Sequence, residues 1–226
     1  RPVTLVCRRV HEPQEKAFNF LLPRGWKVQG GIVRVNPLQA GGPANAIAAK
    51  CDMTVSRDDS EPVSFRILPS VEFAELPPTV PGAGMFPPGS NYQGMVVRPM
   101  LSPQAFLREC FQQLRARAEQ VKMIEEKSLP EMTAAYEKAF GPLNRNLAMA
   151  GLPAIRASAG ALVVEYTEGG TRYKEAMVTA ILDKRGCAFS WCNDSTYAAR
   201  APSAEAEAWK PVLEVISRSI QLDPRW

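Results

Sequence analysis

The chain has 226 residues, of which 22% are charged and 46% are apolar, a globular balance that excludes an intrinsically disordered chain. Its formal net charge of +4 comes without a basic run interleaved with aromatic residues, which argues against nucleic-acid binding. The longest apolar runs are far short of the roughly 20 residues that cross a bilayer, so we expect a soluble chain without a transmembrane segment. This length predicts one domain over residues 1–226.

Five short segments rich in β-branched and aromatic residues predict strands in the first third of the chain: 3–10, 17–22, 31–35, 48–56 and 62–68. We expect the first at a sheet edge. The second and third are expected to pair as a hairpin around the turn Pro23-Arg24-Gly25-Trp26, and the last two around a polar tip.

Residues 69–100 lose this periodicity and are rich in proline and glycine. An irregular stretch of this length is either a functional loop or a surface excursion that packs over a sheet edge. Asn91 and Tyr92 are its candidate binding residues, because an amide and an aromatic ring together offer hydrogen bonds and stacking.

Three helices are predicted from capping residues and apolar spacing: about 103–118, from Ser128 to a stop at Gly151, and about 204–219. Ser102 is the expected N-cap of the first, and Ser128 opens an expected capping box for the second. Pro211 is expected to kink the third helix or delay its start. A short strand over 120–127 separates the first two.

The segment Ala161–Leu182 is the best-specified part of the chain, because Gly169-Gly170 supplies the positive φ values of a tight hairpin turn. Pairing outward from that turn gives a ladder of aromatic and opposite-charge pairs: Glu168 with Thr171, Thr167 with Arg172, Tyr166 with Tyr173, and Glu165 with Lys174. Residues 186–192 predict a further strand, followed by a turn at Asn193-Asp194-Ser195. The order of elements predicts an α+β fold, an antiparallel sheet packed against helices.

The five cysteines form no CxxC motif, and with the single histidine, His11, they give no zinc-like ligand set. Cys110 falls on an apolar helix face and is expected to be a buried thiol. The others, Cys7, Cys51, Cys187 and Cys192, allow three disulfide pairings or a fully reduced state. The pairing option favours an exported protein, with a cytoplasmic location as the alternative.

Two regions resemble PsbP-like domains, the superfamily that includes a photosystem II extrinsic subunit, a Ran-binding relative and bacterial proteins of unknown role. One is the aromatic strand and turn from Phe18 to Trp26, and the other is the closing helix from Ala208 through Leu222. The resemblance implies a sandwich of an antiparallel sheet between helices, and a class of mainly non-catalytic accessory or binding domains. It implies no functional residue, because the matching residues are packing residues.

No catalytic constellation is apparent, so we predict neither catalytic nor metal-binding residues and no cofactor. His11 lies beside Glu12 and Pro13 without a GxSxG motif, as in a solvated loop. Glu175 shares a predicted sheet face with Tyr173 and Met177, where a buried carboxylate needs an arginine or hydroxyl partner or a raised pKa. Trp191 and Tyr197 flank the predicted turn at 193–195 and are further candidate binding residues, although core aromatic residues fit the pattern equally well.

These observations predict a non-catalytic binding or accessory domain, expected to be an exported bacterial protein, whose contact surface is the 69–100 excursion together with the end of the central hairpin. One alternative is a small hydrolase with Glu175 or Glu165 as the acid or base beneath the same loop. A second alternative is an apolar-ligand carrier, which requires an internal cavity.

Overall fold

The computed structural model describes residues 5–60 and 62–226. It is an α+β fold with one sheet of ten strands and a second sheet of three, so the predicted fold class is confirmed. The strands are β1 (Cys7–His11), β2 (Phe18–Pro23), β3 (Lys27–Val33), β4 (Lys50–Ser56), β5 (Ser64–Ile67), β6 (Glu72–Ala74), β7 (Asn91–Tyr92), β8 (Met95–Val97), β9 (Glu119–Ser128), β10 (Arg156–Glu168), β11 (Thr171–Asp183), β12 (Ser190–Pro202) and β13 (Gln221–Leu222). The helices are α1 (Pro103–Leu114), α2 (Pro130–Met149), α3 (Arg185–Ala188) and α4 (Ala206–Arg218), with a 3-10 turn, η1, at Ala83–Met85.

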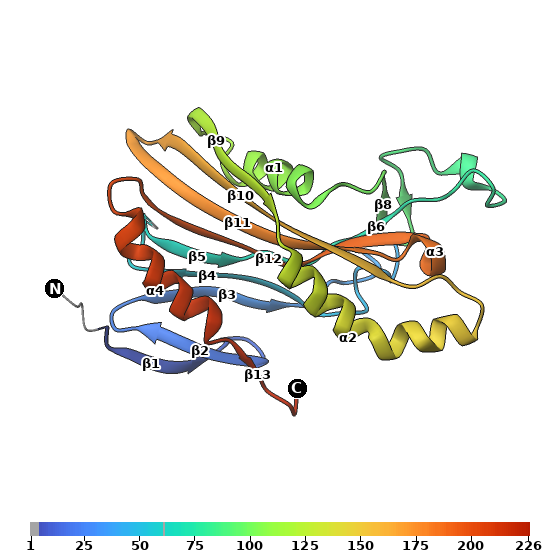
Figure 1. Cartoon of the computed structure of the whole chain (residues 1–226), viewed down its shortest axis with the longest axis horizontal. Coiled ribbons are helices and arrows are strands. Elements are labelled where there is room, and N and C mark those ends of the chain that lie inside the picture. The colour runs from blue at the N-terminus through green and yellow to red at the C-terminus, as the bar shows by residue number, and fades with distance from the viewer. Residues whose placement is uncertain (1–4, 61) are drawn as a thin grey trace.

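The long hairpin β10–β11 lies between β12 and the edge strand β9 in the large sheet, whose main strand order is β3-β4-β5-β12-β11-β10-β9 (Figure 1). Gly169 and Gly170 both have positive φ, 57° and 78°, as a two-residue primed turn requires. All four cross-strand pairs predicted next to the turn are confirmed.

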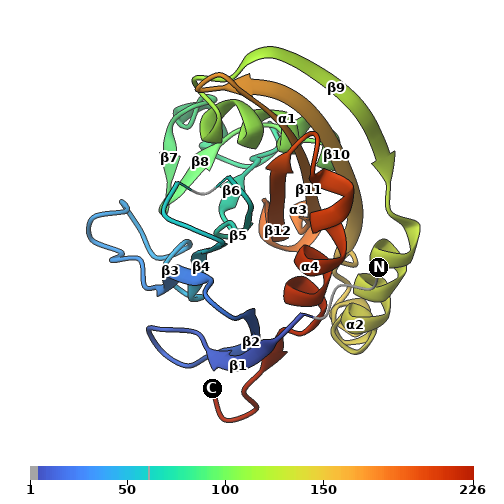
Figure 2. The same ribbon diagram turned by 90° about the vertical axis from the view of Figure 1, so that its left-hand side faces the viewer.

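The small sheet corrects one predicted pairing. β2 pairs with β1 and β13, whereas β3 leaves for the large sheet and pairs with β4, so the expected hairpin of residues 17–22 and 31–35 is wrong. The Pro23–Trp26 turn passes the chain from one sheet to the other. Figure 2 shows β1 and β2 set apart from the strands of the large sheet.

Glu12 joins the small sheet to β3. Its buried carboxylate accepts hydrogen bonds from the backbone N–H groups of Gln14 (2.8 Å), Glu15 (2.8 Å) and Ala17 (3.5 Å), and from Ile32 of β3 (2.7 Å). A Cβ on Gly31 would lie 2.1 Å from Glu12 Oε1, so the approach of the carboxylate requires a glycine there. This carboxylate gives the end of β1 a fixed position over the large sheet.

Three further local predictions are corrected in the second half of the chain. Asn193-Asp194-Ser195 does not reverse the chain: it lies inside β12, where the register against β11 shifts and Ser195 adopts a φ of 46°. Ser128 is no helix cap, because it pairs with Gly160 as the last residue of β9, and α2 begins without a side-chain cap. The predicted strand at residues 186–192 starts only at Ser190, after the short helix α3.

Several other predicted elements are present. The strand expected over 3–10 corresponds to β1, which begins at Cys7, and residues 3 and 4 lie outside the described part of the chain. Ser102 Oγ accepts a hydrogen bond from Ala105 N and caps α1. Pro211 lies inside α4, and the kink expected there stays a prediction. The pairing of β4 with β5 and the strand at β9 are also confirmed.

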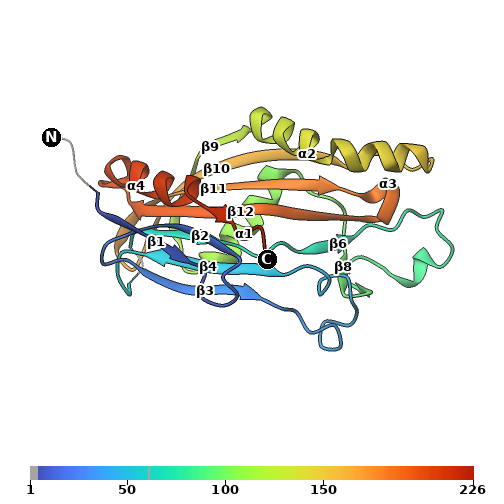
Figure 3. The ribbon, with the colours of Figure 1, turned by 90° about the horizontal axis from the view of Figure 1, so that it is seen from below.

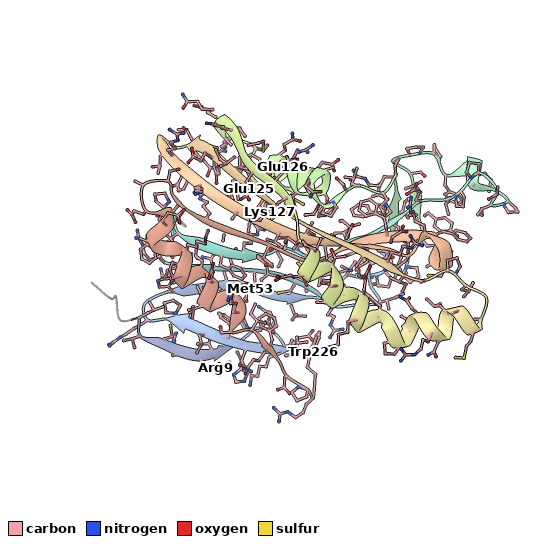
Figure 4. All side chains as sticks on the ribbon, in the orientation of Figure 1. Arg9, Met53, Glu125, Glu126, Lys127 and Trp226 are labelled. Carbon is pink, nitrogen blue, oxygen red and sulfur yellow. The ribbon has the colours of Figure 1, made fainter. Side chains whose placement is uncertain are left out.

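Successive residues of β12 face opposite sides of the large sheet, and each side has its own core. Ala198 packs with Leu107 and Phe111 of α1, whereas Ala199 packs toward α4 and the small sheet. The core on the α4 side also contains Met53 of β4, which is labelled in Figure 4. α2 runs along β10 without a single buried residue of its own (Figure 3).

Residues 69–100 are less irregular than expected, since they contain β6, η1, β7 and β8. β6 pairs with Ser190–Cys192 of β12, next to the Asp183 end of β11. The Gly169-Gly170 turn lies at the other end of that strand, about 40 Å away at the rise of an extended chain. The excursion and the hairpin turn therefore lie at opposite ends of the sheet, as Figure 1 shows, and cannot form one surface.

Candidate functional site

Glu175, the carboxylate proposed for an enzyme, lies fully buried beneath the end of α1. Arg115, the residue that ends α1, donates from Nε to Glu175 Oε2 (2.8 Å) and from Nη2 to Oε1 (2.9 Å). The hydroxyl of Tyr166 donates to the same Oε2 at 2.7 Å. The charge of Glu175 raises the pKa of Arg115 against the opposing effect of burial, and burial followed by that charge raises the pKa of Tyr166.

A second buried arginine lies next to this pair. Arg200 is directly across from Glu175 on β12, stacks over the ring of Tyr173 at 3.9 Å and donates to Glu168 at 2.7 Å. The network therefore contains two arginines and two carboxylates, which balance in charge. Because its carboxylates already accept bonds from arginines, this arrangement supports a structural role better than proton transfer.

Glu165 does not share that environment. It pairs with Lys174 across the hairpin and accepts a hydrogen bond from Arg172 at 2.7 Å, on the face opposite Glu175. Neither glutamate lies beneath the 69–100 loop, which leaves the sheet at its other end. The geometry thus separates the residues that the hydrolase alternative needs together.

A cluster of polar residues occupies the middle of β12 near α2. Lys184 Nζ bonds to Glu72 at 2.6 Å, and the Tyr136 hydroxyl of α2 donates to Asp194 at 3.0 Å. Lys50 of β4 is only 8% exposed, and its ammonium makes no hydrogen bond or ion pair with the residues described. Burial lowers the pKa of Lys50, although the charges of Glu72 and Asp194 oppose this. Burial raises the pKa of the Cys192 thiol to about 11, which makes it unreactive at neutral pH.

The loops at residues 36–49 and 75–97 pack on each other at the end of the sheet that carries β6, and we call them the loop platform. Asn45 connects them: its Nδ2 donates to Glu72 O (3.0 Å) and Gly94 O (2.8 Å), and its Oδ1 accepts from Glu72 N (2.8 Å). The platform has a small apolar core, made of Ala44, Ala74, Phe86, Tyr92, Met95 and Val97. Its loops are therefore held by defined contacts.

The four predicted binding residues do not form one site. Asn91 and Tyr92 lie in the platform, where Asn91 donates to Ala40 O (3.1 Å) and Tyr92 packs edge-on against Phe86. Trp191 is fully buried on the other side of β6, stacked on Phe73, and Tyr197 packs on Phe65. Stacking of Trp191 on a surface ligand is excluded in this structure, because the ring is not exposed.

β9 is one edge strand of the large sheet, opposite β3, and all ten of its residues are exposed. Its register against β10 shifts near Ile124, and charged residues follow the shift: Glu125, Glu126 and Lys127, labelled in Figure 4. Glu126 is held by two bonds of 2.6 Å from Arg108. Bulges and charges of this kind protect a sheet edge from pairing, so we do not place a contact surface there.

Sequence reasoning missed Arg115, Arg200 and Lys50. A buried Glu175 was expected to need an arginine or hydroxyl partner, and it has both, but no local signal identified Arg115, which lies 60 positions away in the sequence.

All five cysteines are free, so none of the disulfide pairings considered from the sequence is present. The residues described include no group of three or more His, Cys, Asp or Glu side chains placed to hold a metal ion. No helix described has both the length and the apolarity needed to cross a membrane.

The fold and these contacts define an α+β sandwich protein. No protein-family model and no curated protein matches the sequence. Among solved structures, the chain is similar to the cyanobacterial PsbP (CyanoP) of Synechocystis sp. PCC 6803, with 9% identity and a TM-score of 0.39 over 96% of this chain and 92% of that one. It is also similar to LpqN, involved in cell envelope biogenesis of Mycobacterium tuberculosis, with 12% identity and a TM-score of 0.35 over 98% of this chain and 93% of that one.

Identities and TM-scores this low transfer no ligand, partner or site residue. The two sequence regions that carry the resemblance are in contact: Trp26 packs against Trp209 of α4 with ring centroids 5.9 Å apart, and β13 pairs with β2.

Proposed function

We propose that this protein is a non-catalytic binding protein whose contact surface is the loop platform. The observation that carries this proposal is where the most exposed apolar side chains lie. Among the residues described, five large apolar side chains are more than 70% exposed, and Leu38, Ile47 and Met85 of the platform are three of them. Large apolar side chains exposed on loops that are held by defined contacts favour a protein-binding surface.

The predicted contact residues Asn91 and Tyr92 belong to this proposal. Their amide and ring contact Ala40 and Phe86, so we propose that they act by holding the loops in a binding-ready conformation. A surface held in place before binding loses less conformational entropy on association. If substitution of both residues leaves partner binding unchanged, this placement is wrong.

Site-specific photo-crosslinking tests the proposal directly. A benzoylphenylalanine placed at Leu38 or at Met85 is expected to capture the same protein partner from a native extract. Leu222 is the matched control, because it is about as exposed as Met85 (73% against 75%) but lies on β13 in the small sheet. Equal capture at all three positions, or none at Leu38 and Met85, contradicts the proposal.

The hydrolase alternative has a separate test. We expect Glu175→Gln to lower the melting temperature, because a buried arginine loses its counter-charge. A Glu175→Gln variant that stays folded with unchanged stability and loses a hydrolytic activity of the wild type supports the enzyme instead.

The exported location stays a prediction, and the free cysteines remove the disulfide argument for it. The sequence of the unprocessed N-terminus of the gene product tests this location, because it would show whether an export signal is present.

The apolar-ligand carrier also stays a prediction. Three depressions on the described surface, lined by residues of α4, of the β2–β3 turn, and of the loops around α3, are open to solvent and are not enclosed apolar cavities. Native mass spectrometry of freshly purified protein would reveal a retained ligand.

A further inference from the structure

A depression of about 460 Å³ lies where the loop platform meets α3 and the start of β10. Its volume is within the range of roughly 300–1,000 Å³ that is usual for ligand sites. Three chain segments line it: Glu75, Leu76, Pro77 and Pro78; Pro153, Ala154 and Arg156; and Asp183, Arg185 and Gly186. Apolar proline rings and charged groups therefore face the same space.

The segments around this depression are held in place. Asn144 of α2 donates to Ile155 O (3.0 Å) and accepts from Ile155 N (2.9 Å), which fixes the segment that carries Pro153 and Arg156. Gly186 lies so close to Pro153 that a Cβ would be 2.6 Å from the ring. Binding here requires little ordering of the backbone.

The two carboxylates of the depression are already bound to Arg185. Asp183 accepts from Arg185 Nε (2.9 Å) and Nη2 (2.9 Å), and Glu75 accepts from Nη1 (3.2 Å) as well as from Met100 N (2.7 Å). The bonds from Arg185, with a smaller contribution from the charge of Arg156 across the hairpin, hold the pKa of Asp183 below its ordinary value, so both partners of the Asp183–Arg185 pair stay charged near neutral pH.

Arg156 differs from Arg185 in having free donors. Its side chain is exposed at the depression, and its guanidinium has no hydrogen bond or ion pair with any part of the chain that the structure describes. A guanidinium with an unused pair of N–H groups fits a planar carboxylate through two parallel bonds. Of the charged groups here, Arg156 is the one left for a ligand.

We propose that this depression binds an acidic peptide segment of a protein partner, with a peptide carboxylate on Arg156 and a neighbouring apolar side chain against Pro77, Pro78 and Pro153. This binding mode rests on the proposed function, because the depression shares residues 75–78 with the loop platform. It adds the chemistry of the partner: a carboxylate next to an apolar residue.

Nuclear magnetic resonance titration of the ¹⁵N-labelled full chain tests this with three probes: acetyl-Leu-Glu-amide, acetyl-Leu-Gln-amide and acetyl-Gly-Glu-amide. We expect the Leu-Glu probe to cause saturable shifts in the amide signals of Ala154 and Gly186. The Leu-Gln probe lacks the charge, and the Gly-Glu probe lacks the apolar side chain. Each is expected to bind about tenfold more weakly, in line with the loss of a charge-assisted pair or of a buried side chain.

Variants at Arg156 assign the binding to this residue. Arg156→Gln is expected to weaken the Leu-Glu probe about tenfold, and Arg156→Lys, which keeps the charge but not the fork, less than that. Arg145→Gln on the exposed side of α2 is the matched control and is expected to bind as the wild type does. Equal affinity for the Leu-Glu and Leu-Gln probes, unchanged binding by Arg156→Gln, or no saturable shift overturns the binding mode.

The two proposals fail in distinguishable ways. Loss of probe binding with crosslinks intact at Leu38 and Met85 overturns only the acidic-peptide site. Absence of those crosslinks with probe binding intact overturns the loop platform as the contact surface.

Discussion

Arg115 and Glu175 form a two-bond ion pair that joins the end of α1 to the middle of β11. Glu175 is fully buried, and the side chain of Arg115 is only 13% exposed. The pair therefore forms part of the contact between helix and sheet, with Tyr166 as a third member. Removing one partner of the pair is expected to destabilise the fold, because the other charge then stays in the interior without a counter-charge.

We expect Arg115→Met to destabilise the fold by about 3–5 kcal/mol, because it leaves a buried carboxylate without a counter-charge. The double variant Arg115→Met with Glu175→Met removes both charges and is expected to lose less stability than Arg115→Met alone. Urea unfolding of the wild type, both single variants and the double variant gives the coupling. A double variant that loses the sum of the two single effects would show that the pair is not coupled.

We expect the connection that Glu12 makes between the two sheets to weaken in acid. Burial acts to raise the pKa of Glu12, but four backbone N–H donors outweigh it and hold the pKa below its ordinary value of 4.5. The folded pKa is the lower one, so the contribution to stability is complete above pH 4.5 and disappears as the pH falls through the folded value. We expect Glu12→Gln to cost about 2 kcal/mol at pH 7, with a smaller difference from the wild type in acid.

Unfolding curves of Glu12→Gln and wild type between pH 3 and pH 7 check this. The exposed Glu137→Gln is the control, and its difference from the wild type is expected to stay small at every pH. A Glu12→Gln difference that does not shrink below pH 4.5 would contradict the role of the ionised carboxylate.

For Lys50 we expect the opposite dependence of folding stability on pH. Burial holds its pKa below the ordinary 10.5, so the folded state binds the proton less well than the unfolded state. Stability is then reduced at neutral pH and recovers as the pH rises from the lowered pKa toward 10.5. We expect Lys50→Met to stabilise the fold slightly at pH 7, by less than about 1 kcal/mol, because burial disfavours the charged ammonium while the charges of Glu72 and Asp194 partly offset this cost. The gain, measured by urea unfolding, is expected to shrink at alkaline pH, and exposed Lys138→Met is expected to show no such gain.

The hydrogen bonds of Tyr136 are expected to stabilise α2 against local opening. α2 has no buried residue, and the Tyr136 hydroxyl bonds to Asp194 (3.0 Å) and lies 2.6 Å from Ser195 Oγ. We expect Tyr136→Phe to speed hydrogen exchange in residues 130–141 by the equivalent of about 1 kcal/mol, while α1 stays unchanged. Hydrogen-exchange mass spectrometry checks this. Tyr92→Phe is the control, since it removes a hydroxyl from the loop platform and should leave α2 as it is.

The structure also shows which expectations local signals could support. Gly169-Gly170 determines its turn through the φ values that only glycine adopts easily, and the register of the hairpin follows from the turn. Ser102 and Pro103 likewise specify the start of α1 within two residues. Asn193-Asp194-Ser195 has the composition of a turn, but Asn193 and Asp194 pair with β11, and the residues on either side of the three pair with β6 and β5. The three residues are therefore a register shift within β12.

The amino-acid sequence was sufficient for the elements whose stabilising contacts lie within a few residues: the central hairpin, the capped helix α1 and the apolar spacing of α4. Which strands pair across long stretches of chain, and which charges are buried, depended on the folded molecule. β2 pairs with a strand from the C-terminus, Glu175 meets an arginine 60 residues away, and Arg156 lies beside Pro77 and Pro153 without an ion pair to any residue of 5–60 or 62–226. Such contacts join segments that carry no mark of each other in the sequence, because burial and charge pairing are properties of the packed arrangement.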